Sequence, residues 1–284
     1  MRANPHFLNK STAFWGYAKL ISEQLGYSKA NRVLYHDEHS IRTKLHKMDI
    51  DIDKVLLKEV AAYLEYRANL LNNTAKDLFM DVNEARQRFN HLFQIYQSNN
   101  FTSSLPLNKQ KGDKRDYAYF TCMINIITED VLREFCNNHG FTYGEDIGFD
   151  DDPRSLTYIL NQNSEVQGIL SRRFDGAFPS TVNPRAIWEI KEYYYTTTFG
   201  SRIADGVYET QLDGHEVNHL SDVLHTPIEH IYFIDDYNTW WNMGRSYLCR
   251  IIDMLHMGLV DEVIFGREIF ERWPESLNEL LYNK

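Results

Sequence analysis

Two carboxylates and a lysine occur in one short segment, at a spacing that suits metal-assisted chemistry. Asp175 lies in an apolar, β-type run, and a stretch with two prolines separates it from the run that carries Glu189 and Lys191. Two such runs joined by a turn predict a pair of antiparallel strands. Side chains alternate along a strand, so Glu189 and Lys191 are expected on one face, with Trp188 and Ile190 on the other. The hairpin would then bring Asp175 beside the Glu189–Lys191 pair.

This combination of groups suits the hydrolysis of a phosphate ester. Hard divalent cations such as Mg²⁺ take one or two carboxylate ligands and complete their coordination with water and phosphate oxygens. An ion held by Asp175 and Glu189 would polarise a phosphate and lower the pKa of a bound water. Lys191 would orient that water or offset the charge that develops on the phosphoryl group. The alternative for so short a pattern is a charged hairpin on which Glu189 and Lys191 form a solvated pair.

The elements around this segment predict a mixed α/β core. We expect a helix over residues 117–138, which Gly140 would end, and strands over 173–178, 186–194, 230–234 and 260–265. Helices over about 202–222 and 239–258 separate the later strands. This order indicates a mixed sheet that is flanked by helices.

The pattern Phe-Asp-Gly…Glu-Ile-Lys across the predicted hairpin resembles the PD-(D/E)XK nuclease superfamily. The resemblance covers residues 117–265, although Phe174 precedes Asp175 where many members have a proline. The run Glu189-Ile-Lys-Glu-Tyr-Tyr, followed by Phe199-Gly-Ser-Arg202 and a helix, is similar to type II restriction endonucleases related to the DpnII/MboI group. The resemblance implies a restriction-endonuclease-like fold. It also implies a Mg²⁺-dependent endonuclease that cuts double-stranded DNA at a specific sequence.

In that group, a helix ahead of the hairpin supplies a further acidic ligand, followed by Gly-aromatic and Gly-Glu pairs. Here Glu129 precedes Gly140-Phe141 and Gly144-Glu145. The resemblance therefore implies Glu129 as a further ligand, with Glu134 in reserve. The implied catalytic residues are Asp175, Glu189, Lys191 and Glu129, and the three acids among them would hold the metal ion.

A second pattern, His215-Glu-Val-Asn-His219, fits the H-E-x-x-H zinc motif. Two histidines four apart on a helix could bind zinc, with Glu216 as general base and His225 as third ligand. This pattern resembles the metzincin protease signature, but Asp222 stands where that family has a turn-forming glycine. A zinc metalloprotease is therefore the less favoured hypothesis, and a polar helix face is the simpler interpretation.

Charge divides the chain into two parts. The protein has 284 residues and a formal net charge of −10. Residues 1–116 hold 18 Lys and Arg against 13 Asp and Glu, whereas residues 117–284 hold 12 against 27. With the polar stretch 98–115 as a linker, we expect a helical, basic region over 1–116 that contacts DNA or forms a dimer. The catalytic domain would occupy 117–284, where carboxylates could bind cations.

The first part shows helical spacing over most of its length. Ser11 or Thr12 is expected to cap a helix that ends at Gly26, and residues 28–47 are expected to form a basic loop. Candidate DNA contacts are Lys29, Arg32, Arg42, Arg172, Arg173 and Arg202, together with Lys109, Lys111, Lys114 and Arg115 in the linker. Arginines suit phosphates and guanine edges, although a solvated surface position is the alternative for Arg32, Arg42 and Arg202.

Other features limit the class of protein. No apolar run reaches the roughly 20 residues that cross a bilayer, so no membrane association is expected. The three cysteines lack metal-type spacing and are expected to be reduced thiols in a cytoplasmic protein. Cleavage of both DNA strands predicts a homodimer with two centres. A nuclease of the same fold with a role in repair, defence or transposition remains an open alternative.

Overall fold

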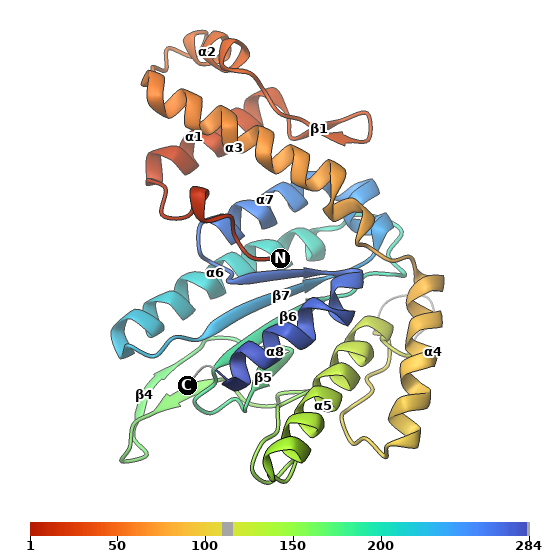
Figure 1. Ribbon diagram of the computed structural model, residues 1–284. Coiled ribbons are helices and arrows are strands. Elements are labelled where there is room, and N and C mark those ends of the chain that lie inside the picture. Colours follow the sequence, from red (N-terminus) through yellow and green to blue (C-terminus); the bar gives the residue numbers. More distant parts are fainter. Residues whose placement is uncertain (110–115, 283–284) are drawn as a thin grey trace.

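The computed structural model describes residues 1–109 and 116–282, and Figure 1 shows a central sheet with helices on both sides. The helices are α1 (Thr12–Leu25), α2 (Glu38–His46), α3 (Lys54–Asn73), α4 (Val82–Ser98), α5 (Tyr119–His139), α6 (Ser201–Leu224), α7 (Arg245–His256) and α8 (Arg272–Tyr282). The strands are β1 (Ser28–Lys29), β2 (Arg32–Val33), β3 (Tyr158–Leu160), β4 (Val166–Ile169), β5 (Gly176–Phe178), β6 (Ala186–Lys191), β7 (Glu229–Ile234) and β8 (Glu262–Phe265). In this part of the chain, no helix is long and apolar enough to cross a membrane.

The central sheet has four strands in the order β5-β6-β7-β8. Strands β5 and β6 are antiparallel, as predicted, and Gly176 pairs with Trp188. Strands β6, β7 and β8 are parallel. Parallel neighbours need a crossover connection, and α6 and α7 supply the two crossovers. The mixed α/β architecture expected from the sequence is therefore confirmed.

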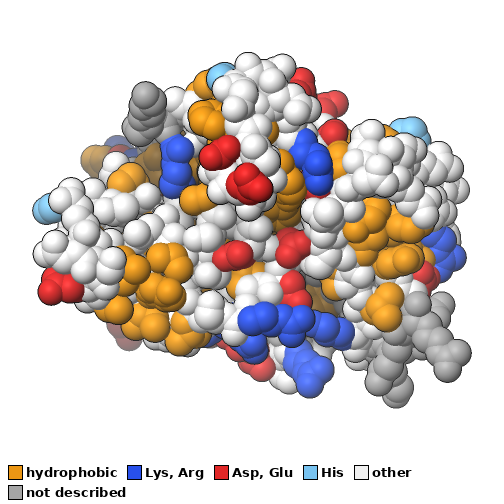
Figure 2. Space-filling model, turned by 90° about the horizontal axis from the view of Figure 1, so that it is seen from below, with side chains coloured by type: hydrophobic (Ala, Val, Ile, Leu, Met, Phe, Trp, Pro, Cys, Tyr) orange, Lys and Arg blue, Asp and Glu red, His pale blue; other side chains and the backbone are white. Residues whose placement is uncertain are grey.

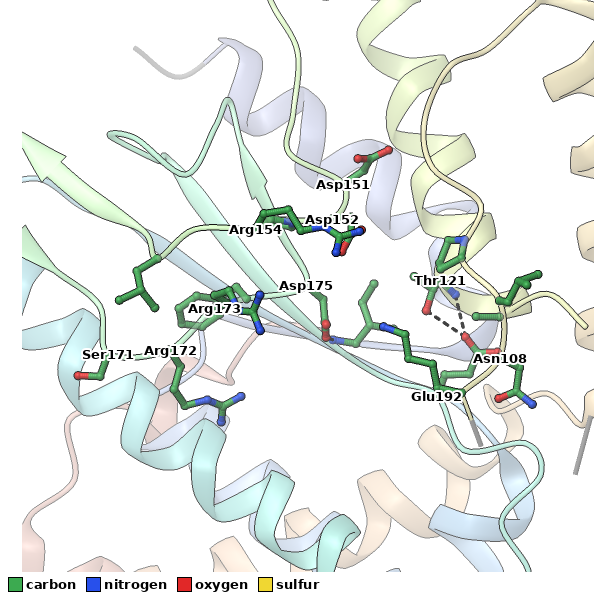
Figure 3. Close-up of a pocket in the computed structure, with 18 residues that line it drawn as sticks. Asn108, Thr121, Asp151, Asp152, Arg154, Ser171, Arg172, Arg173, Asp175 and Glu192 are labelled. Carbon is green, nitrogen blue, oxygen red and sulfur yellow. Dashed lines mark hydrogen bonds and ion pairs between the residues drawn. The ribbon is translucent and has the colours of Figure 1, made fainter. Parts of the chain in front are cut away.

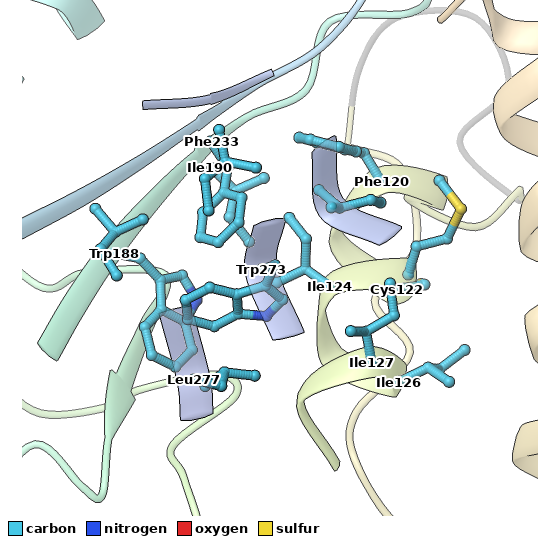
Figure 4. Packing of buried hydrophobic residues seen from close by; sticks show 14 of the residues in the cluster. Phe120, Cys122, Ile124, Ile126, Ile127, Trp188, Ile190, Phe233, Trp273 and Leu277 are labelled. Carbon is cyan, nitrogen blue, oxygen red and sulfur yellow. The ribbon is translucent and has the colours of Figure 1, made fainter. Parts of the chain in front are cut away.

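One face of the sheet packs against α5 and α8. Trp188 and Ile190 of β6 enter this layer together with Phe233 of β7. Trp273 of α8 packs edge-on against both Trp188 and Phe233, at centroid distances of 5.4 and 5.0 Å (Figure 4). Buried apolar residues of α5, including Ile124, complete the layer. Because Trp188 and Ile190 point to this face, Glu189 between them points to the opposite one.

The opposite face is covered by α6 and α7. Ile203 and Val207 of α6 pack with Tyr232 and Ile234 of β7 in a second buried cluster. The apolar face of α7 joins the same cluster. The side chains that alternate with Trp188 and Ile190 therefore lie between β6 and α6.

Helices α1, α2 and α3 pack around their own apolar cluster. The end of α3 continues onto the main body, where Ala68 and Leu71 join the cluster under α7. Helix α4 contributes Ala85 and Phe89 to the layer that contains α5. Helix α4 therefore shares the core of the sheet, although it precedes residue 116, the expected domain boundary.

Several sequence-based expectations differ from the structure. Helix α1 ends at Gly26, as expected, and Gly26 has a φ of 98°. Residues 28–47 were expected to form a loop, but they form the β1–β2 hairpin and α2. The Asp37 side chain caps α2 by accepting a hydrogen bond from the Ser40 N–H (2.8 Å). The β3–β4 hairpin and α8 were not expected at all.

Candidate active site

The candidate site lies where β5 and β6 meet. Asp175 directly precedes β5, and its backbone N–H donates to the carbonyl of Trp188 (3.0 Å). Its carboxylate accepts a hydrogen bond from the backbone N–H of Ile190 (2.7 Å). On β6, the Lys191 ammonium donates to the Glu189 carboxylate (2.7 Å). Glu189 and Lys191 both influence the pKa of Asp175, and the strand pairing places Asp175 beside the strand that carries them, so the structure brings these three residues together.

A close approach between the strands supports this arrangement. A Cβ atom on Gly176 would lie only 2.1 Å from the Trp188 ring. A larger residue next to Asp175 would therefore displace the ring or the strand. The position of Asp175 relative to Glu189 depends on this glycine.

Arg172 adds a second positive charge to the site. Its guanidinium lies 3.2 Å from Glu189, 2.9 Å from Glu209 and 3.5 Å from Asp213. Glu209 and Asp213 are one turn apart on α6, so both can reach the same guanidinium. The site therefore contains four acidic and two basic side chains, which β6, α6 and the segment before β5 contribute.

Asp213 is a site residue that the sequence analysis missed. Its side chain is buried, and its Oδ2 atom lies 3.5 Å from the Arg172 guanidinium. One feature of the sequence could have indicated Asp213. Glu209 and Asp213 are four residues apart in the helix expected after the hairpin, so they share one face of that helix. That spacing does not show which side of the helix faces the sheet.

The charges of the site shift several pKa values. The enclosing protein limits the hydration of Asp175, and the nearby Glu189 carboxylate adds repulsion, so the pKa of Asp175 rises to about 7. The Asp175 side chain is exposed to water on its cavity side. The pKa shift therefore comes from partial loss of hydration and from repulsion by Glu189, and it does not require complete burial. Burial also raises the pKa of Asp213 to about 6, although Arg172 opposes the shift. Burial alone would lower the pKa of Lys191, but the Glu189 carboxylate raises it above its usual range.

A cavity of about 680 Å³ opens beside Asp175. Figure 3 shows Asp175 between Arg173 on one side and Glu192 on the other. The labelled lining residues are Asn108, Thr121, Asp151, Asp152, Arg154, Ser171, Arg172, Arg173, Asp175 and Glu192. The cavity thus gives a polar ligand access to one carboxylate of the site and to several arginines.

Glu192, the residue after Lys191, has a structural contact. Its carboxylate accepts hydrogen bonds from the N–H and the hydroxyl of Thr121, each at 3.0 Å. Ala118, the N-cap residue of α5, provides no side-chain cap, so Glu192 performs this role for the helix. Burial raises the pKa of Glu192 to about 7. The end of β6 is thereby attached to the start of α5.

The structure does not bring Glu129 to this site. Its carboxylate accepts hydrogen bonds from the backbone N–H groups of Thr102 and Ser103, at 2.9 and 2.7 Å, and pairs with Arg133 at 2.7 Å. These contacts stabilise the segment after α4, and Glu129 does not line the cavity beside Asp175. The reserve candidate, Glu134, lines a different cavity. The acidic helical residue near Asp175 and Glu189 comes from α6, because α6 covers the face to which Glu189 points.

The chemistry of the donors suits a hard divalent cation. Two carboxylates that repel each other would both be stabilised by a cation, and Asp213, whose Oδ2 atom pairs with Arg172 at 3.5 Å, adds a further buried carboxylate to the cluster. Over the described ranges, no three His, Cys, Asp or Glu side chains are grouped for metal binding. A Mg²⁺ ion needs only one or two carboxylates, because water and phosphate oxygens complete its coordination. Asp175 and Glu189 are therefore the residues that could hold such an ion.

The H-E-x-x-H pattern lies on α6. Glu216 accepts hydrogen bonds from the N–H and the hydroxyl of Ser171, the latter at 2.6 Å. His215, His219 and His225 are exposed. In the structure, Glu216 therefore connects α6 to the segment before β5.

The other basic residues of the sequence analysis lie in different places. Arg173 is exposed at the cavity, and Arg202 is exposed in the first turn of α6. Lys29, Arg32 and Arg42 are exposed on β1, β2 and α2, and none of them lines the cavity. Lys111, Lys114 and Arg115 lie outside the described residues. On the face shown in Figure 2, basic side chains are interspersed with acidic and apolar ones.

Two family models match the chain. The model described as Domain of unknown function (DUF7687) matches residues 80–280, and that described as Domain of unknown function (DUF7690) matches residues 1–74. No curated protein and no solved structure matches the chain. The two matched regions meet between α3 and α4, so α4 falls within the same region as the sheet.

Proposed function

The chain belongs to the DUF7687 family, and we propose that it is a metal-dependent nuclease that hydrolyses phosphodiester bonds of double-stranded DNA. One observation carries the proposal, namely the meeting of Asp175, Glu189 and Lys191 where β5 and β6 pair. The cavity gives a phosphate group access to Asp175, and Arg172 and Arg173 also line it. Their spacing in the sequence also resembles the PD-(D/E)XK pattern.

Each residue has a role that its surroundings support. A bound Mg²⁺ ion would supply a Lewis acid and a water of lowered pKa. Asp175 and Glu189 would hold that ion, since both present carboxylate oxygens within one cluster. Lys191 keeps its proton because Glu189 is adjacent, so it can donate a hydrogen bond to a phosphate oxygen or a water. Arg173, exposed at the cavity, would contact the backbone of the DNA strand.

The more detailed proposal is a type II restriction endonuclease that cuts at a specific sequence as a homodimer. Two centres related by a two-fold axis can act on the two DNA strands. A nuclease in repair, defence or transposition would share the same residues. Mapping the cut ends on modified and unmodified DNA would distinguish these roles.

Plasmid cleavage tests the proposal. The wild-type protein should cut DNA in Mg²⁺, and Asp175→Asn and Glu189→Gln should abolish cleavage, because each removes a charged ligand. Lys191→Met should slow cleavage by about 10²-fold or more, because it removes a positioned donor. His215→Ala, which changes an exposed residue of α6, is the matched control and should cut like the wild type.

Metal binding provides a second measurement that does not depend on activity. Mg²⁺ should raise the Tm of the wild-type protein, because an ion that binds only the folded state stabilises it. The same addition should leave the Tm of Asp175→Asn and Glu189→Gln unchanged. Cleavage by Asp175→Asn at the wild-type rate would refute the assignment.

A further inference from the structure

The β3–β4 hairpin adjoins the cavity along the chain. Leu156, just before β3, and Ser171, just after β4, both line the cavity. Arg172 and Arg173 follow and lead directly to Asp175. Figure 1 shows the hairpin at the lower left, where it projects beyond the central sheet. Anything held at the cavity therefore lies close to the base of this hairpin.

One face of the hairpin is fixed to the main body. Ile159 and Leu170 are buried in a cluster with Val217 of α6. A Cβ atom on Gly168, which pairs with Ile159, would lie 2.5 Å from the Leu220 side chain of α6. The hairpin therefore packs closely on α6 and has a defined orientation.

The tip and the other face are exposed. Val166 and Ile169 are 64% and 51% exposed, and Gln162, Asn163 and Gln167 are also exposed. The side chains of Gln162 and Asn163 form no hydrogen bond with any residue that the structure describes, so their amide groups are available to a ligand.

The turn itself has a separate support. The Asn161 side chain accepts hydrogen bonds from the N–H groups of Asn163 and Glu165, at 2.9 and 3.0 Å. Asn161 therefore stabilises the turn that carries Gln162 and Asn163. The side chains of Gln162 and Asn163 do not contribute to the turn, so they can be changed without removing its support.

The charge of the hairpin differs from that of its flanks. Glu165 is the one charged residue of the segment 155–170. Of the arginines at its base, Arg154 pairs with Asp152 and Arg172 pairs with Glu189 and Glu209, whereas Arg173 is exposed at the cavity. A nearly neutral tip with amides, above an exposed arginine at its base, has the two kinds of group that proteins use on DNA. Cationic side chains hold phosphates there, while amides and apolar groups contact base edges.

We propose that the β3–β4 hairpin enters the major groove of duplex DNA and reads bases with Gln162, Asn163 and Gln167. This inference rests on the proposed function and extends it to the choice of cleavage site. A two-stranded ribbon, with strands about 5 Å apart, fits the major groove, which is about 12 Å wide. Asn and Gln pair with the N6 and N7 edge of adenine, and exposed apolar side chains contact the thymine methyl group. Val166 and Ile169 would make such apolar contacts.

A binding experiment tests this inference without cleavage. Asp175→Asn protein would be used to select preferred sequences from a random duplex pool, and its Kd would be measured for the selected and a scrambled duplex at fixed salt. Adding Gln162→Ala and Asn163→Ala should reduce the preference for the selected duplex by about 5- to 150-fold per lost base contact. The affinity for the scrambled duplex should stay the same.

Two controls separate base reading from other effects. Gln87→Ala with Asn90→Ala removes exposed amides from α4 and should leave the preference intact. Arg173→Ala should weaken the binding of both duplexes and reduce the salt dependence, as the loss of a phosphate contact does.

The outcomes also separate this inference from the proposed nuclease. Base reading by the hairpin is overturned if no sequence is selected, if the hairpin variants keep the preference, or if they weaken both duplexes equally. If the wild-type protein cuts DNA without preference, the nuclease stands and the hairpin proposal fails. If the hairpin variants lose a preference that Asp175→Asn protein shows, while the wild type cuts no DNA, the hairpin proposal stands and the nuclease fails.

Discussion

Asp175 lies at the edge of the cavity, where the surrounding protein and Glu189 both disfavour its negative charge. Its pKa in the folded protein, about 7, is above the ordinary value for an aspartate. The folded state therefore binds a proton at a pH where the unfolded chain has released it. Between about pH 4 and pH 7, the free energy of unfolding falls as the pH rises, because of this one group.

Asp175→Asn should therefore stabilise the protein at high pH. Above pH 7 the variant lacks a charge that the fold disfavours, and we expect a gain on the order of 1 kcal/mol after allowance for solvent screening, or about 2 °C in Tm. Below about pH 4 the wild-type side chain is protonated in both states, so the two proteins should have the same Tm. Thermal unfolding from pH 4 to pH 8 without divalent ions measures the difference. A difference that did not change with pH would contradict this account.

At the same scale, the residues that sequence could predict were those within one hairpin. Asp175, Glu189 and Lys191 are joined by a turn, and strand alternation alone sets which of them share a face. Asp213 could not be found in this way, since its place depends on how α6 packs on the sheet. Glu129 was assigned by resemblance, but its carboxylate binds the segment that contains Thr102 and Ser103.

Among the elements, β5 and β6 hold the site through the contact between Gly176 and Trp188. Gly176→Ala should destabilise the protein by roughly 1–3 kcal/mol, because a methyl group would overlap the indole ring. Gly16→Ala is the matched control. Gly16 lies inside α1, and its added Cβ atom would meet no other atom within 4 Å, so this change should stabilise by about 0.5–1 kcal/mol. Urea unfolding of both variants tests the contrast, which would be lost if both changed stability in the same direction.

The elements that sequence predicted are those with a strong local signal. Helices α1, α5 and α6 and the four strands of the central sheet occur where apolar spacing placed them, within a few residues. Helix α2 was missed because its segment is short and polar, and its stability comes from the Asp37 cap and from Ile41 and Leu45, which pack under α1 and α3. Strands β3 and β4 are short, and β4 is mostly exposed, so their apolar pattern is weak.

Across the whole molecule, a buried ion pair joins the two family regions. Arg67 of α3 binds both oxygens of Asp253 of α7 at 2.9 Å. Tyr63 donates to the same carboxylate (2.6 Å), and Arg67 also donates to Ser22 of α1 (2.8 Å). Both charged side chains are almost completely buried. The N-terminal helices are thus attached to α7 by a buried ion pair, and loss of either charged side chain would leave the other without its partner.

Removing one member of this pair should be costly. Arg67→Ala should lower the free energy of unfolding by about 3–5 kcal/mol, because Asp253 would keep a buried charge without a partner. The double variant Arg67→Met, Asp253→Leu should lose less, since no unpaired charge remains. Lys10→Ala, which removes the more exposed ion pair with Glu59, should cost no more than about 1 kcal/mol. Equal losses for Arg67→Ala and Lys10→Ala would show that the buried pair has no special role.

The ion pairs of Arg172 also determine which charges are available in the ligand-free protein. While its guanidinium neutralises Glu189 and Glu209, it is not available to an incoming anion. Its two uses exclude each other, so the resting protein carries its own counterion inside the acidic cluster. Any ligand that brings positive charge to Glu189 sets this arginine free to turn toward negative charge outside.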